Sequence, residues 1–151
     1  IAAISQNKKG ELIVFPSYSQ VRLWEDSISV LDSFDGDLVK VRDAIEKYNV
    51  LLKERIQKTA VLLKKIYILN QSQKDGIQFY KIYGREKADL LLHQTFRVKL
   101  LKGLGNQKEY FQLLNKICKE IDVTRIERPI NSFNPKELVD DLLLDLNVSS
   151  L

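Results

Sequence analysis

The length, composition and charge of the chain exclude several classes of protein. Its 151 residues suffice for one domain with a modest core, or for a small domain with a helical extension. Hydrophobic residues make up 44% and charged residues 29%, with a formal net charge of +4, which excludes a disordered or collagen-like chain. No apolar run exceeds four residues, whereas a membrane span needs about 20.

The chain holds a single cysteine, Cys118, and a single histidine, His93. One cysteine excludes an internal disulfide and favours a reducing, intracellular compartment, cytoplasmic or nuclear. Most metal sites and nucleophile–histidine pairs need further Cys or His side chains, and none stands at ligand spacing here. We therefore expect no enzyme, no cofactor, no metal and no small-molecule substrate. Cys118 is expected to be buried, and His93 to be structural or at the surface.

Methionine is absent, and the sequence begins at Ile1. This combination predicts that the chain is a domain fragment of a larger protein. We therefore expect it to act as one part of a larger intracellular complex.

Residues 1–36 have the pattern of a small β element. Short stretches rich in β-forming residues are separated by turn signals that contain Gly10, Pro16 and Asp35-Gly36. The sequence therefore predicts strands or a hairpin over residues 1–36. The stretches are Ile1–Ser5, Leu12–Phe15, Val21–Trp24 and Ser27–Phe34.

The segment IAAISQNKKGELIVFPSYSQVRLWE resembles one blade of a WD-repeat β-propeller. In that family a third strand ends in Trp-Asp, and Trp24-Glu25 stands in that place here. The following VLDSFDGDLVKV is similar to the opening of a next blade but lacks the usual Gly-His pair. The resemblance covers residues 1–40 and implies a propeller remnant, because a single blade must bury its faces against two neighbours. The alternative is a small sheet or hairpin packed on helices.

From Asp37 onward the apolar period changes to that of a helix. Positions spaced alternately by three and four residues are apolar in eight of ten cases. This spacing predicts a heptad seam and a long coiled-coil-like helix. The width of the stripe favours packing against two neighbouring helices, within one subunit or between subunits. The ten positions are Leu38, Val41, Ile45, Tyr48, Leu52, Arg55, Thr59, Leu62, Ile66 and Leu69.

Two further helices are expected in the body of the chain, at about Ile77–Leu101 and Gln107–Ile121. The glycine-rich residues 103–106 separate them. Residues 37–151 are therefore predicted to form a helical bundle. The expected fold class is mainly α, a bundle with a long coiled-coil-like helix and a small N-terminal β element.

A last, acidic amphipathic helix is predicted at residues 134–147. Asn134 supplies an N-cap, Pro135 takes the first helical position, and Glu137 closes a capping box. A helix that interleaves leucine with aspartate must bury one face. Three alternatives are open: docking on the chain's own basic helices, insertion into a partner's groove, and nuclear export, because Val139, Leu143, Leu146 and Val148 have a spacing like that of a leucine-rich export signal.

Charge is unevenly distributed along the chain. Residues 137–151 hold four acidic residues and no basic one, whereas residues 97–119 hold six cations against one acid, Glu109. The basic stretch is typical either of a solvated helix face or of a surface for nucleic acid or an acidic partner. Its cations are Arg97, Lys99, Lys102, Lys108, Lys116 and Lys119.

Together these features predict a non-catalytic protein–protein interaction or scaffold module of a larger intracellular complex. It would assemble with a protein partner, or with itself, by burying the apolar helix seam. The alternative is a nucleic-acid-binding module that uses residues 97–119. The interface candidates are Ile45, Leu52, Leu62, Ile66, Leu142, Leu143 and Leu146.

Overall fold

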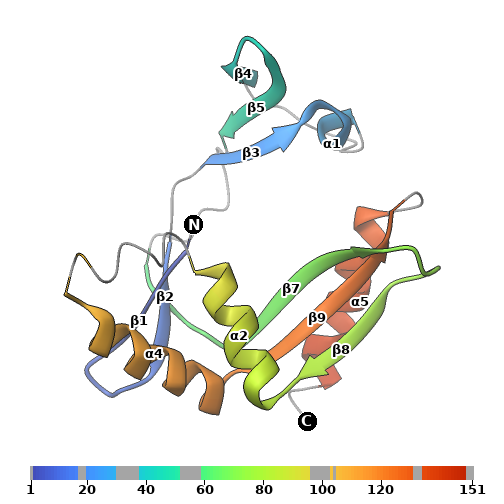
Figure 1. The fold of residues 1–151 in the computed structure, drawn as a ribbon. Coiled ribbons are helices and arrows are strands. Elements are labelled where there is room, and N and C mark those ends of the chain that lie inside the picture. The colour runs from blue at the N-terminus through green and yellow to red at the C-terminus, as the bar shows by residue number, and fades with distance from the viewer. Residues whose placement is uncertain are drawn as a thin grey trace. The chain divides into compact units, whose positions relative to one another are not determined.

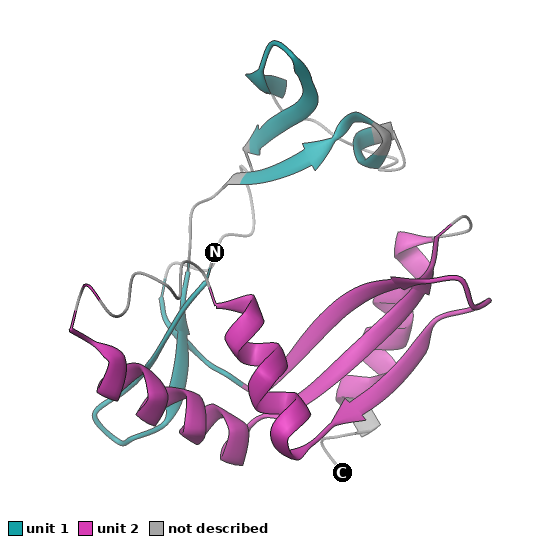
Figure 2. Ribbon diagram, viewed as in Figure 1, with its two compact units in different colours: residues 1–63 teal, residues 64–151 magenta. Residues whose placement is uncertain are grey.

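The chain divides into two compact units, Ile1–Leu63 and Lys64–Leu151 (Figure 2). Within the described residues the first unit contains two three-stranded sheets, and the second contains one sheet with helices on both faces. The residues that the computed structural model describes are 2–16, 20–29, 38–51, 59–95, 103, 105–130 and 134–148.

The first sheet is antiparallel, in the order β1 (Ala3–Gln6), β2 (Leu12–Phe15) and β6 (Val61–Leu62). In the turn between β1 and β2, Asn7 Oδ1 accepts hydrogen bonds from the backbone N–H groups of Lys9 and Glu11, both at 2.9 Å. Gly10 completes this turn at a φ of 79°, a conformation that costs glycine little because it has no Cβ. β2 ends directly before Pro16, as the sequence predicts.

The second sheet is also antiparallel, in the order β3 (Gln20–Trp24), β5 (Ile45–Leu51) and β4 (Leu38–Arg42). The short helix α1 (Glu25–Ser29) follows β3 directly. Val50 is paired with Val21 on one side and Leu38 on the other, and only 1% of it is exposed. Val21 and Leu38 are themselves 37% and 44% exposed, so Val50 is the buried residue of this face.

The sheet of the second unit has the order β7 (Lys65–Ser72), β9 (Asp122–Pro129) and β8 (Gln78–Ile82). β9 runs parallel to β7 and antiparallel to β8, and Figure 1 shows it between them. Val123, Thr124 and Ile126 are at most 2% exposed. Because successive side chains point to opposite faces, β9 is buried on both faces of the sheet.

Helices α2 (Gly84–Gln94) and α4 (Gln107–Glu120) pack against each other, and α5 (Pro135–Val148) lies apart from them along the sheet. Lys87 Nζ on α2 donates to the carbonyl oxygen of Cys118 on α4 at 2.8 Å. The hydroxyls of Thr95 and Tyr110 lie 2.8 Å apart and tie the other ends together. No helix within the described residues combines the length and apolar character needed to cross a membrane.

The prediction of a mainly α helical bundle is wrong. Strands hold 41% of the described residues and helices 37%, in three three-stranded sheets. The expected coiled-coil-like helix at Leu38–Leu69 is replaced by β4, β5, β6 and the first part of β7. Its segments are rich in β-branched and aromatic residues, such as Val39, Tyr48 and Ile66, whose side chains pack well on a pleated sheet. Leu52 and Arg55 of the seam lie outside the described residues.

The helix expected at Ile77–Leu101 is also shorter than predicted. Residues Gln78–Ile82 form β8, and α2 begins only at Gly84, which has a φ of 54°. Gly84 therefore marks the change from strand to helix. In the N-terminal part, residues Glu25–Ser29 form α1 at the start of the expected strand Ser27–Phe34, whose residues 30–34 lie outside the described part.

Candidate functional site

Helix α5 starts where its capping residues place it. Asn134 Oδ1 accepts a hydrogen bond from the backbone N–H of Lys136 at 3.0 Å, and the carbonyl oxygen of Asn134 accepts one from Leu138 at 3.2 Å. Pro135 takes the first helical position, where a missing N–H costs nothing. The cap thus fixes the residue at which α5 begins.

The inner face of α5 is held to the sheet by a charged contact. Asp145 accepts hydrogen bonds from Lys65 Nζ and from the Tyr67 hydroxyl, both at 2.5 Å. Only 5% of the Lys65 side chain is exposed, so the Asp145 carboxylate supplies its counter-charge in a nearly dry position. The contact therefore orients α5 as well as attaching it.

The protonation of this contact follows from its geometry. Burial opposes ionisation of Asp145, but the hydrogen bonds from Lys65 and Tyr67 outweigh it and lower the pKa of this carboxyl. Burial, with the hydrogen bond to Asp145, raises the pKa of the Tyr67 hydroxyl far above its ordinary value. Near neutral pH the contact therefore holds an ionised Asp145 and a neutral Tyr67.

The outer face of α5 is more apolar than a helix surface needs to be. Val139, Leu143 and Leu146, spaced by four and three residues, share one side of the helix, and we call them the α5 stripe. They are 51%, 54% and 38% exposed, and Leu144 beside them is 64% exposed. The inner face is half-buried. Beyond Pro135 it carries only two large apolar side chains, Leu138 and Leu142. α5 thus presents its larger apolar side outward.

Charged side chains of both signs flank the α5 stripe. Lys136 and Asp140 are exposed and stand three residues before Val139 and Leu143, so they lie beside the stripe. Glu137, two residues before Val139, projects from a different side of the helix. Of the two acids that face inward, Asp141 and Asp145, Asp145 is paired with Lys65. The outer surface of α5 is therefore an apolar row bordered by one cation and one carboxylate.

The opposite face of the same sheet carries a network of paired charges. Arg125 Nη1 donates to Glu86 at 2.9 Å, and its Nε lies 3.6 Å from Glu127, which also lies 3.5 Å from Lys74. Lys74 donates to the Tyr80 hydroxyl at 3.2 Å, and this raises the pKa of Lys74. The two cations of this network, Arg125 and Lys74, and its two carboxylates, Glu86 and Glu127, thus balance each other in charge.

His93 and Cys118, the two residues considered for chemistry, lie in different surroundings. His93 is exposed, and its Nδ1 lies 2.6 Å from the carbonyl oxygen of Asp89 in the preceding turn. Cys118 is half-buried rather than fully buried. Across the described ranges, no three His, Cys, Asp or Glu side chains are arranged to hold a metal ion.

The predicted interface residues do not form one surface. Leu142, Leu143 and Leu146 share α5, with Leu142 half-buried and the other two exposed. Ile45 lies on β5, Leu62 on β6 and Ile66 on β7, in three different sheets, and Leu52 lies outside the described residues. The seam that was to join them does not exist as one element.

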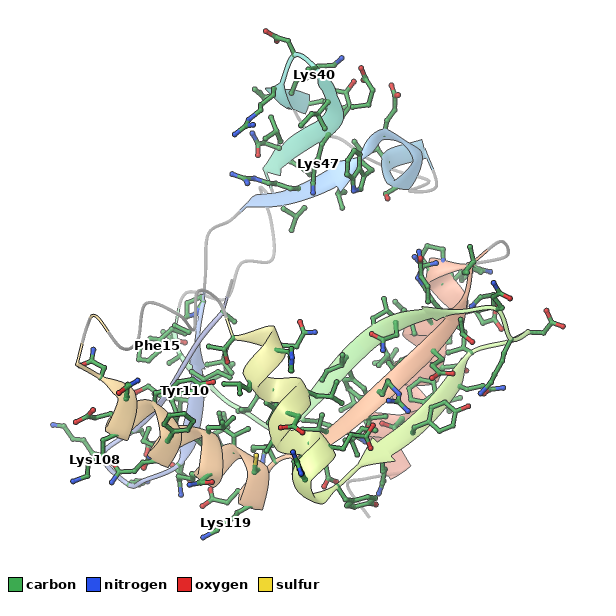
Figure 3. All side chains as sticks on the ribbon, in the orientation of Figure 1. Phe15, Lys40, Lys47, Lys108, Tyr110 and Lys119 are labelled. Carbon is green, nitrogen blue, oxygen red and sulfur yellow. The ribbon has the colours of Figure 1, made fainter. Side chains whose placement is uncertain are left out.

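The predicted basic stretch is described only in part. Arg97, Lys99 and Lys102 lie outside the described residues. On α4, Lys108 and Lys119 are exposed (Figure 3), whereas Lys116 is paired with Glu120 one turn along the helix. The described cations of α4 thus do not gather into a strongly positive patch.

Sequence reasoning missed Lys65 and Tyr67, the two residues that contact Asp145 of α5. No local pattern indicates them, because Asp145 lies 80 and 78 residues away along the chain.

Comparisons of the chain with protein-family models, with curated proteins and with solved structures give no match. The functional argument therefore rests on the surfaces described above.

Proposed function

We propose that the chain is a non-catalytic protein–protein interaction module that binds a partner of a larger complex through the α5 stripe. The observation that carries the proposal is the orientation of α5, which turns Val139 and Leu143 outward while Asp145 faces the sheet. A helix normally turns its apolar side inward. The reversed arrangement is supported by the Lys65–Asp145 contact and leaves an apolar row available for a partner's groove.

The charges around the stripe define the chemistry of that groove. The charged side chains beside the stripe are Lys136 and Asp140, each three residues before a stripe residue. The matching surface is therefore an apolar groove whose rim offers a carboxylate to Lys136 and a cation to Asp140. Burying the exposed half of each stripe residue contributes roughly 1 kcal/mol. This is less than the cost of association, so contacts to these two rim charges must add to it.

The test is a comparison of three forms of the protein as bait in affinity capture. Val139→Asp with Leu143→Asp removes the stripe, and Phe111→Asp is the matched control, because Phe111 is 49% exposed on α4. We expect a partner that the wild type and Phe111→Asp both bind and that the double variant loses by at least tenfold in affinity. Titration calorimetry with that partner measures the loss.

Two outcomes would contradict the proposal. In one, every captured protein binds all three forms equally, so the stripe contacts nothing. In the other, light scattering shows a wild-type dimer that the double variant abolishes, which would make the stripe a contact between copies of this chain.

A further inference from the structure

The sheet formed by β3, β5 and β4 has two faces of different character. Residues Val21, Val50 and Leu38 pair across one face, where Val50 is buried. Side chains alternate along a strand, so the residues between them belong to the other face. Cross-strand pairing places Arg22 opposite Asn49 and Trp24 opposite Lys47. We call Arg22, Trp24, Lys47 and Asn49 the Trp24 face.

An exposed indole is the main feature of the Trp24 face. Trp24 is 52% exposed, and Lys47 Nζ lies 4.9 Å from the centroid of its ring. Val39 on β4, which pairs with Asn49, is 58% exposed on the same face. Lys47 lies over the Trp24 ring, and the exposed part of the indole offers a platform on which a planar base can stack.

The cations of the Trp24 face have no acidic partner among the described residues. Arg22 Nε donates to the neutral Asn49 Oδ1 at 3.3 Å, and Lys47 contacts the Trp24 ring. On the other face, by contrast, Lys40 Nζ forms an ion pair with Glu46 at 2.7 Å. In Figure 3, Lys47 lies beside β3 whereas Lys40 lies on β4. Among the described residues, the cations of the Trp24 face are thus not balanced by a carboxylate, whereas Lys40 is.

Glu25, the acid that follows Trp24, also acts on the side of Lys40. The hydrogen bond with Glu46 is the main cause that raises the pKa of Lys40, and the charge of Glu25 adds to it. Glu25 likewise adds to the effect of Glu46 in raising the pKa of Tyr48.

We propose that the Trp24 face binds single-stranded nucleic acid, with a base stacked on the Trp24 indole and phosphates near Arg22 and Lys47. Stacking needs a base that is free of its own helix, so a single strand fits this face better than a duplex. Arg22 on β3 and Lys47 on β5 are diagonal neighbours in the sheet, about 7 to 8 Å apart. The face is thus sized for one or two nucleotides and is distinct from the α5 stripe.

The full chain contains one tryptophan, so its emission reports on this site alone. We expect oligo-dT of about ten nucleotides to quench the emission to a plateau in low salt. Affinity should fall with salt with a logarithmic slope near −1.4, for two phosphates neutralised on a single strand. Arg22→Gln or Lys47→Gln should each reduce that slope by about 0.7.

For the variants that lack the indole, binding is measured by the fluorescence anisotropy of a labelled oligonucleotide. Trp24→Ala should weaken binding by about tenfold, within the range measured for base–aromatic stacking. Trp24→Phe keeps an aromatic ring and should retain most of the affinity, which separates stacking from a folding defect. Lys40→Gln is the matched control on the other face and should leave binding unchanged.

The following results would overturn the proposal. Oligo-dT could neither quench the emission nor change the anisotropy at 50 mM salt. Lys40→Gln could weaken binding as much as Lys47→Gln. A duplex of the same length, or heparin, could bind as tightly as oligo-dT with no effect of Trp24→Ala, which would indicate a response to charge alone.

Discussion

Lys65 is a cation with a side chain that is only 5% exposed, and its counter-charge comes from a helix 80 residues later. A buried charge without a partner is far more costly than one that is paired and hydrogen-bonded. Asp145 therefore does more than a surface carboxylate would, because it keeps Lys65 and the Tyr67 hydroxyl satisfied at the same time. Asp145 is therefore one of the side chains that attach α5 to the sheet, beside the half-buried Leu138 and Leu142.

The Asp145 contact predicts how α5 responds to acid. Its pKa is lowered in the folded chain from an ordinary value of 3.8, so its stabilising contribution is present above pH 3.8 and is lost as the pH falls below it. Lys65, Tyr67 and Lys81 are the groups that act on it. We expect the protection of α5 amides in hydrogen exchange, corrected for intrinsic rates, to decrease between pH 4 and pH 2.

Two variants of the same helix test this interpretation. Asp145→Asn should lower α5 protection at pH 5 by about tenfold or more, because it removes a hydrogen bond to a charged group, and should weaken the acid response. Asp140→Asn changes an exposed carboxylate on the outer side and should behave as the wild type. Equal protection in both variants would show that Asp145 does not hold α5.

At the scale of elements, local signals predicted what depends on local chemistry. The cap at Asn134 and the stop before Gln107 correctly indicated α5 and α4, and Pro16 correctly ended β2. The stretch Leu38–Leu69 could not be assigned in this way. In a run that is rich in apolar residues, a spacing of three and four can always be found and fits a heptad. Here the residues between those positions are also β-formers, so the same run fits a strand.

The missing information for that stretch lies far away in the sequence. Ile66 pairs with Val123 and Leu69 with Ile126, so β7 becomes a strand because β9 is available to pair with it. The spacing of apolar residues within β7 gives no information about β9. For the same reason the outer leucines of α5 could be predicted as an amphipathic pattern, whereas the side that faces the sheet could not.

The cap of α5 gives a prediction at this scale. Asn134→Ala removes the acceptor for the Lys136 N–H and should destabilise the helix by about 1 kcal/mol. Amide exchange in the first turn of α5 measures this loss as a fivefold fall in protection. Asn115→Ala, at an exposed position within α4, is the control and should not destabilise its helix. If both variants leave exchange unchanged, the Asn134 side chain is not an effective cap.

At the scale of the whole molecule, the two proposed surfaces belong to different compact units. The Trp24 face lies in residues 1–63 and the α5 stripe in residues 64–151. All strands of the β7–β9–β8 sheet, with α2, α4 and α5, come from the second unit. Each unit therefore has the elements of its own sheets, and its surface can act without the other.

This division predicts that residues 64–151 fold by themselves. We expect this fragment to keep the amide protection of β9 that it has in the full chain, because the partners of β9 are all present. A fragment of residues 64–121 lacks β9 and should show no protected β7 or β8. If residues 64–151 are unprotected in isolation, the second unit depends on the first.

The position of β9 in the sheet also determines when the sheet can form during synthesis. β7 and β8 are joined by a short turn, yet neither pairs with the other, and the strand between them is made some 40 residues after β8 ends. During synthesis on a ribosome, β7 and β8 leave the exit tunnel before β9. Their backbone N–H and C=O groups therefore have no strand partner until residues 122–129 have been made. Helices α2 and α4 are made during that interval, and their mutual packing can shelter the apolar side of β8 until the sheet closes.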